Sequence, residues 1–119
     1  MFRLFFATVG VLLLGVTSAD AWTRIATEAE YRAQVADRPQ VDTEGRGQVI
    51  FHGDGTVTGE WSGQTVSGAW QWHQGFLCRN LLIGDRETGT NCLLSEIRGN
   101  QLRGTQDQGR GNVTVTTLQ

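Results

Sequence analysis

The order of apolar and polar residues divides the chain into an apolar leader, one short amphipathic stretch and a long region of alternating segments. In the amphipathic stretch, Tyr31 and Val35 lie four residues apart, which places them on one face of a helix. Thr27 is suited to cap such a helix, and Pro39 ends the pattern. A helix is therefore predicted over residues 28–37.

From residue 46 onward, strand-forming residues alternate with glycine-containing turns. Strands are predicted at 46–52, 56–62, 65–72, 76–83 and 90–98. The stretches 101–107 and 112–118 can form one further strand or two. The predicted fold class is mainly β with one N-terminal helix, as a small antiparallel meander or barrel-like sheet that contains one disulfide.

A short internal repeat suggests how two of these strands pair. Thr56-Val57-Thr58-Gly59-Glu60-Trp61 recurs nine residues later as Thr65-Val66-Ser67-Gly68-Ala69-Trp70. A tight turn at Gly63-Gln64 would place one glycine of each copy opposite the other and leave a notch between bulky neighbours. The candidate ligand slot consists of Gly59, Trp61, Gly68, Trp70 and Trp72. The alternative, which we favour, is a small core filled by its own indoles.

The next hairpin places an arginine among apolar residues. A three-residue loop at 73–75 would pair Trp70 with Cys78, so that the disulfide packs against the indoles and Arg79 lies on the other face, under the helix. A half-buried arginine needs an anionic partner. One interpretation is an ion pair with a helix carboxylate, from Glu28, Glu30 or Asp37. The other is that Arg79 recognises a carboxylate or phosphate ligand.

Composition and charge limit the classes of partner. The chain has 119 residues, 16 glycines, one proline and a net charge of −2, and all ten of its basic residues are arginine. A mildly acidic chain of this length predicts one domain, here residues 22–119, without the basic surface that binds nucleic acid or anionic lipid. We expect a monomer whose partner is an unknown small molecule or protein.

The first 21 residues have the pattern of a signal peptide. Arg3 precedes an apolar stretch from Leu4 to Val16, and Ala19-Asp20-Ala21 has the small-x-small form of a cleavage site. The apolar stretch is too short to span a bilayer as a helix. The mature protein is therefore predicted to be periplasmic or secreted, and its two cysteines, Cys78 and Cys92, to form one structural disulfide.

Residue patterns for catalysis and cofactor binding are missing from the sequence. Gly53-Asp54-Gly55-Thr56-Val57-Thr58-Gly59 does not have dinucleotide-binding spacing, and the absence of lysine excludes a P-loop. No serine lies in a nucleophile elbow, and His52 and His73 lack the further ligands of a zinc site. We therefore expect no catalytic residues, no metal and no cofactor.

Several motifs resemble a known family of short exported bacterial proteins of unknown function, whose members often carry the name dihydrodipicolinate reductase. The motifs are Asp54-Gly55-Thr56-Val57-Thr58-Gly59, Val66-Ser67-Gly68-Ala69-Trp70-Gln71-Trp72, Gly75-Phe76-Leu77-Cys78-Arg79, Asn91-Cys92 and Asp107-Gln108-Gly109. Asn80 departs from the family pattern, which has aspartate after Cys-Arg. A true reductase of that name has a Rossmann domain, which this chain lacks, so we take the resemblance to imply an exported family and not a reductase.

A fainter resemblance connects the Gly-x-Trp pattern and the disulfide with periplasmic inhibitors of secreted metalloproteases. The sequence thus predicts a non-catalytic binding or structural module, with a protease inhibitor as the alternative.

Overall fold

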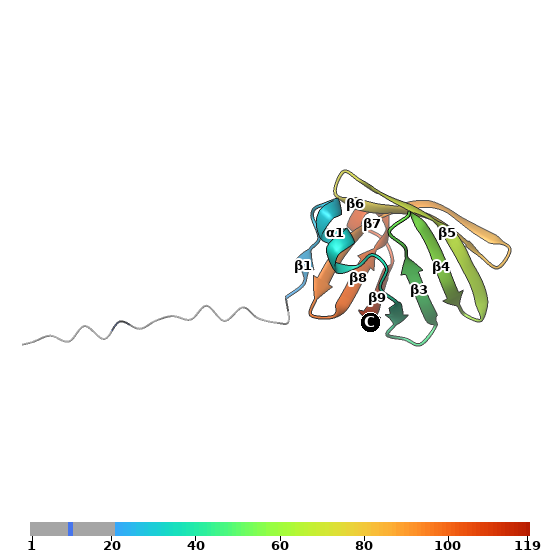
Figure 1. Cartoon of the computed structure of the whole chain (residues 1–119), viewed down its shortest axis with the longest axis horizontal. Coiled ribbons are helices and arrows are strands. Elements are labelled where there is room, and N and C mark those ends of the chain that lie inside the picture. Colours follow the sequence, from blue (N-terminus) through green and yellow to red (C-terminus); the bar gives the residue numbers. More distant parts are fainter. Residues whose placement is uncertain (1–9, 11–20) are drawn as a thin grey trace, which may run out of the picture.

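Eight antiparallel strands close into a barrel in the computed structural model, which describes Gly10 and residues 21–119 (Figure 1). The elements are β1 (Thr23–Arg24), α1 (Glu28–Gln34), β2 (Gln40–Asp42), β3 (Gly47–Phe51), β4 (Thr56–Trp61), β5 (Gln64–His73), β6 (Phe76–Ile83), β7 (Arg86–Arg98), β8 (Gln101–Thr105), α2 (Gln106–Gly109) and β9 (Val113–Leu118). The predicted signal peptide at 1–21 lies outside the described residues, apart from Gly10 and Ala21.

The strands are hydrogen-bonded in the order β7-β6-β5-β4-β3-β2-β9-β8, and pairing of β7 with β8 closes the barrel. The short β1 adds to the same long strand, β7. This confirms the predicted fold class: mainly β, antiparallel, with an N-terminal helix and one disulfide. The last two predicted segments are separate strands, β8 and β9. The three-residue β2, directly after Pro39, was not predicted because it is too short to show an alternating pattern.

Helix α1 begins at its predicted cap. The Thr27 side chain accepts a hydrogen bond from the backbone N–H of Glu30, and the Glu30 carboxylate accepts one from the backbone N–H of Ala26. The first bond satisfies a backbone donor that the first helical turn leaves unpaired, and the second fixes the chain just before the cap. The helix ends at Gln34, three residues before the predicted boundary.

Helix α1 closes one end of the barrel. Successive strands run in opposite directions, so the β3–β4 turn, the β5–β6 turn and the end of β9 lie at the same end. The helical segment is bound there: Arg32 donates to the Gly53 carbonyl at 2.8 Å, the Gly53 N–H donates to Asp37 at 2.7 Å, and Arg38 donates to the Gln119 carbonyl at 3.3 Å. The opposite end, which we call the mouth, is formed by the turns after β2, β4 and β6 and by residues 106–112.

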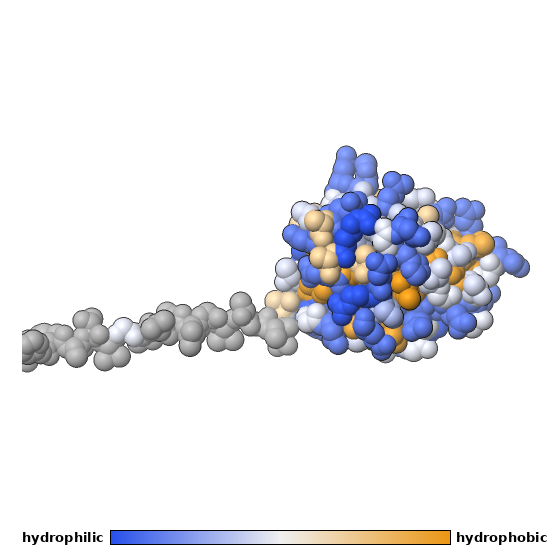
Figure 2. Space-filling view, in the orientation of Figure 1, coloured by the Kyte–Doolittle hydropathy of each residue, from blue (hydrophilic) through white to orange (hydrophobic). Residues whose placement is uncertain are grey.

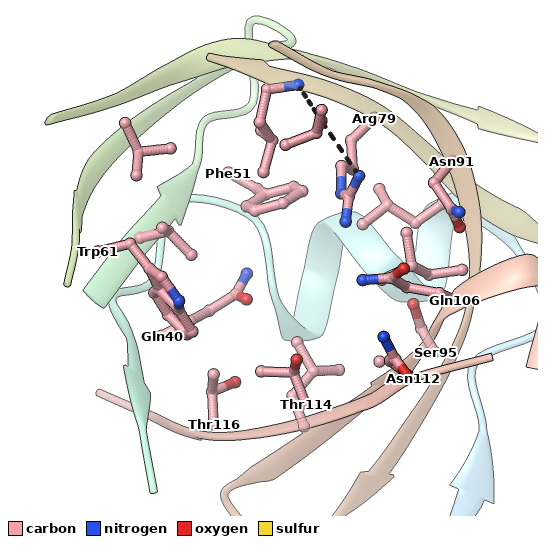
Figure 3. Close-up of a pocket in the computed structure, with 18 of the residues that line it drawn as sticks. Gln40, Phe51, Trp61, Arg79, Asn91, Ser95, Gln106, Asn112, Thr114 and Thr116 are labelled. Carbon is pink, nitrogen blue, oxygen red and sulfur yellow. Dashed lines mark hydrogen bonds between the residues drawn. The ribbon is translucent and has the colours of Figure 1, made fainter. Parts of the chain in front are cut away.

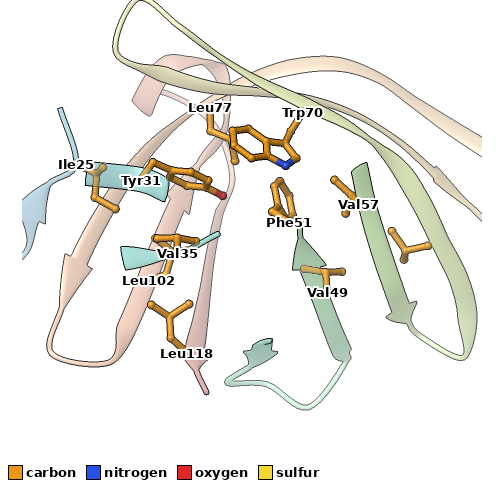
Figure 4. Packing of buried hydrophobic residues seen from close by; sticks show 11 residues of the cluster. Ile25, Tyr31, Val35, Val49, Phe51, Val57, Trp70, Leu77, Leu102 and Leu118 are labelled. Atoms are coloured by element: carbon orange, nitrogen blue, oxygen red, sulfur yellow. The ribbon is translucent and has the colours of Figure 1, made fainter. Parts of the chain in front are cut away.

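Aromatic packing anchors the helix to the barrel. The ring of Tyr31 lies 5.3 Å from that of Trp70 and 5.4 Å from that of Trp72, measured between centroids. Tyr31 and Val35 are fully buried, and they face inward as their helical spacing predicts (Figure 4). The apolar core is therefore concentrated at the helix-closed end.

The β4–β5 turn differs from the prediction by its register. The turn residues are Ser62 and Gly63, both with positive φ (50° and 76°), and Trp61 therefore pairs with Gln64. Positive φ at both central positions is the geometry of a type I′ turn, whose twist matches the flanking strands. In this register Gly59 lies opposite Val66, and Gly68 lies opposite Val57. The predicted pairing of Gly59 with Gly68 was wrong, and the notch that depended on it is not formed.

The β5–β6 turn also has two residues where three were predicted. Gln74 and Gly75 have φ of 49° and 86°, and His73 pairs directly with Phe76. Trp70 consequently pairs with Arg79 and not with Cys78. Because side chains alternate along a strand, this one-residue difference puts the side chains of Trp70 and Arg79 on one face of the sheet and that of Cys78 on the other. The prediction that the disulfide packs against the indoles was wrong.

The disulfide links adjacent strands. Cys78 on β6 and Cys92 on β7 lie directly opposite each other, with their Cα atoms 3.9 Å apart, and are bonded as predicted. No helix among the described residues is long and apolar enough to cross a membrane.

Candidate functional site: the barrel interior

A cavity of about 620 Å³ occupies the interior of the barrel (Figure 3). Its volume lies within the range of about 300–1,000 Å³ that is typical of small-molecule sites. Figure 3 shows side chains that converge on it from the surrounding strands, with the ribbon of α1 behind them. The cavity thus begins beneath the helix and extends to the mouth, where its lining residues Arg86 and Val113 are exposed.

Much of the wall is apolar because alternate residues of each strand point inward. The inward apolar side chains come from six of the strands: Val49, Phe51, Trp61, Val66, Leu77, Leu81, Ile83, Leu93 and Leu102. Several of them belong to the buried core, so the wall of the cavity is continuous with the packing under α1. A molecule with an apolar body can be desolvated against this surface.

The charged residues that line the cavity are all arginines. They are Arg46, Arg79 and Arg86, and no aspartate or glutamate belongs to the wall. Arg46 is already neutralised by two nearby carboxylates: its guanidinium lies 2.6 Å from a carboxylate oxygen of the buried Asp42 and 3.1 Å from one of the exposed Glu44. This hydrogen-bonded pairing lowers the pKa of Asp42 from its ordinary value. The remaining positive charges of the wall are those of Arg79 and Arg86.

Arg79 is the arginine that the barrel holds inside. It lies on β6, and its guanidinium makes one side-chain hydrogen bond, at 3.5 Å, to the hydroxyl of Thr88. That distance is long for such a bond, and the same hydroxyl also accepts from the Leu81 N–H and donates to the Gly89 carbonyl. Burial lowers the pKa of the Arg79 guanidinium, because desolvation disfavours its charged form.

The three helix carboxylates proposed as partners of Arg79 make other contacts. Glu28 pairs with Arg32, Glu30 accepts from Ala26, and Asp37 accepts from Gly53. No salt bridge of Arg79 is present within residues 21–119. The ion-pair interpretation was therefore wrong, because these carboxylates face the surface loops and not the barrel interior.

Polar groups without a protein partner lie on other parts of the wall. The Tyr31 hydroxyl, the Gln40 side-chain amide nitrogen and the Thr116 hydroxyl are buried and have no hydrogen-bond partner in the protein. Burial raises the pKa of the Tyr31 hydroxyl, because desolvation disfavours its charged form. A buried polar atom without a partner costs free energy, so these groups favour a polar occupant. Sequence reasoning missed Gln40 and Thr116, since neither belongs to a recognisable motif.

The five residues of the predicted ligand slot do not form one site. Trp61 lines the barrel cavity, whereas Trp70 is part of the buried core and donates its indole N–H to the His52 carbonyl at 2.8 Å. Trp72 packs against this core beside Tyr31. Neighbouring strands pack directly against the two glycines: a Cβ at Gly59 would overlap backbone atoms of β3, and a Cβ at Gly68 would overlap backbone atoms of β6.

Part of the mouth is held by side chains from two of the motifs quoted above. Asn91 on β7 donates to the Asp107 carboxylate at 2.9 Å, and the Asp107 N–H donates back to the Asn91 side chain at the same distance. Asp107 and Gln108 have φ of 54° and 57°, a conformation that is unfavourable for residues other than glycine. The pair of bonds holds this strained turn next to Gln106 and Asn112, which line the cavity.

No group of three or more His, Cys, Asp or Glu side chains that could hold a metal ion is found in the part of the chain that the structure describes. Comparison with protein-family models, with curated proteins and with solved structures yields no match to this chain.

Proposed function

We propose that this chain is a non-catalytic binding protein that holds a small, largely apolar molecule inside its barrel. The observation that carries the proposal is the cavity of about 620 Å³, whose wall combines inward apolar side chains with a few polar groups. This composition is typical of small-molecule sites, in which apolar surface contributes affinity and a few polar groups fix orientation.

Two further features support the proposal. The face of the molecule drawn in Figure 2 is covered mainly by hydrophilic side chains, with hydrophobic ones visible in separate small areas between them. That face therefore offers no broad apolar surface for a protein partner. The Cys78–Cys92 disulfide supports an exported protein, periplasmic or secreted, because disulfides persist in oxidising compartments.

The proposal is tested with N-phenyl-1-naphthylamine, a neutral aromatic probe whose fluorescence rises in apolar surroundings. The mature protein should bind it saturably, with one probe per chain. Thr114→Phe should weaken binding about tenfold or more, because Thr114 lines the cavity beside Gly104 and a phenyl ring there fills the space. Far-UV circular dichroism and thermal melting verify that the variant is folded.

Thr117→Phe is the matched control. It places the same substitution on the same strand, but residue 117 is an odd number of positions from 114 and so faces outward. Its probe affinity should equal that of the wild type. Absence of saturable binding, or equal weakening by the two substitutions, would refute interior binding.

A further inference from the structure

We infer that the molecule held in the barrel carries a single anionic group of the carboxylate class, bound by Arg79, on an apolar body. This inference deepens the proposed function and depends on it, since it assigns the ligand class of the same cavity. Four observations about the wall carry it.

The first observation is the contact set of Arg79. A guanidinium presents five N–H donors, and here one of them makes one long bond to a neutral hydroxyl that already has two other partners. Taking a charged group out of water is costly unless an opposite charge and good hydrogen bonds compensate for it. The described protein residues do not supply that charge, so an anionic ligand fits this position.

The second observation is the charge of the whole wall. Its three charged side chains are arginines, in a protein whose net charge is −2. Arg46 is paired with the carboxylates of Asp42 and Glu44, and Arg86 is exposed at the mouth. Arg79 is therefore the one uncompensated positive charge in the interior. A ligand with one negative charge matches it, whereas the second charge of a phosphate dianion would have no partner.

The third observation is the depth of Arg79. It lies four residues before Ile83 on β6, which corresponds to about 13 Å along a strand at about 3.3 Å per residue. It pairs with Trp70 on β5, whose ring lies beside that of Tyr31 under the closing helix, and with Asn91 on β7, which holds the Asp107 turn of the mouth. The anionic group is thus bound between the core and the turn of residues 106–112, and water screens the interaction less there than on the outer surface.

The fourth observation is what surrounds Arg79. Its inward neighbours on the same strand are Leu77 and Leu81, and Phe51 reaches the cavity from β3 (Figure 3). The unpaired polar atoms of Gln40 and Thr116 come from β2 and β9, which lie across the barrel from β6 in the strand order. An acyl-chain or aromatic carboxylate fits the Arg79 side of the cavity, with its charge at Arg79 and its apolar body against the leucines and Phe51, and a hydroxyl on that body would pair with Gln40 and Thr116.

The test displaces N-phenyl-1-naphthylamine with decanoate, with decan-1-ol and with decyl phosphate at neutral pH. The wild type should bind decanoate about tenfold or more tightly than decan-1-ol, and decyl phosphate no more tightly than decanoate. Arg79→Gln should abolish the preference for decanoate and leave the affinity for decan-1-ol unchanged. Arg79→Lys, which keeps the charge but loses the planar pair of donors, should retain part of the preference.

Arg110→Gln is the control, since it removes a positive charge from the exposed segment of residues 106–112 at a position that does not line the cavity, and it should leave the preference intact. Equal affinity of the wild type for decanoate and decan-1-ol, or an undiminished preference in folded Arg79→Gln, would overturn the inference. Tighter binding of decyl phosphate than of decanoate would overturn its assignment to the carboxylate class. If N-phenyl-1-naphthylamine itself does not bind, the proposed function fails. If it binds but decanoate is not preferred over decan-1-ol, only the inference about the anionic group fails.

Discussion

Removing the disulfide should cost a large part of the stability of this barrel. Cys78 and Cys92 are 14 residues apart in sequence and close a ring that contains most of the β6–β7 hairpin. In the chain-entropy description, a ring of about 15 residues restricts the unfolded chain by roughly 3 kcal/mol at 25 °C. The free energy of unfolding of the double variant Cys78→Ala/Cys92→Ala should therefore be about 3 kcal/mol lower than that of the wild type.

Urea denaturation followed by tryptophan fluorescence measures this loss. With slopes of about 1–3 kcal/mol per molar urea, the midpoint should fall by about 1–3 M. Dithiothreitol should lower the wild-type midpoint by a similar amount and leave that of the double variant unchanged. A loss below about 1 kcal/mol in the double variant would refute the reasoning, because the cross-link would then add little to strands that are already paired.

Three further predictions concern single residues. Thr27→Ala should lower stability by about 1 kcal/mol in thermal or urea denaturation, because it removes the side-chain cap of α1. Gly68→Ala should cost about 1–3 kcal/mol, because the added Cβ overlaps the Asn80 carbonyl; a melting temperature equal to that of the wild type would contradict this. Arg46 lowers the folded-state pKa of Asp42, so this pairing stabilises the protein above the unfolded-state pKa of about 3.9 and the stabilisation is lost as pH falls through the lower, folded-state pKa. Asp42→Asn should therefore be less stable than the wild type at pH 7, and the difference should shrink towards pH 2.

The elements could be predicted because local patterns determine them. The spacing of Tyr31 and Val35, the cap at Thr27 and the glycine-containing turns were sufficient to place α1 and seven of the strands approximately. The pairing of those strands was less predictable, since it depends on which two residues take positive φ in each turn. Ser62 and Gln74 do so beside a glycine, and neither residue type signals that conformation strongly.

The same dependence explains the errors at the site. The prediction placed Arg79 on the opposite face of the sheet from Trp70, under the helix, whereas a shift of one residue in the β5–β6 pairing puts both on the interior face. The sequence indicated that Arg79 needs an anionic partner, but only the closed barrel shows that the helix carboxylates are elsewhere. The cavity itself could not be predicted, because closure of the barrel requires β2 to pair with β9, which lies at the other end of the domain sequence, and no local pattern signals that pairing.

A crystal structure of the mature protein with bound decanoate tests the central claim most directly. The account predicts decanoate inside the barrel, with its carboxylate oxygens within about 3.2 Å of the Arg79 guanidinium nitrogens and its chain against Phe51 and Leu77. Decanoate bound to the outer surface, or inside the barrel with its carboxylate at the mouth and away from Arg79, would contradict it.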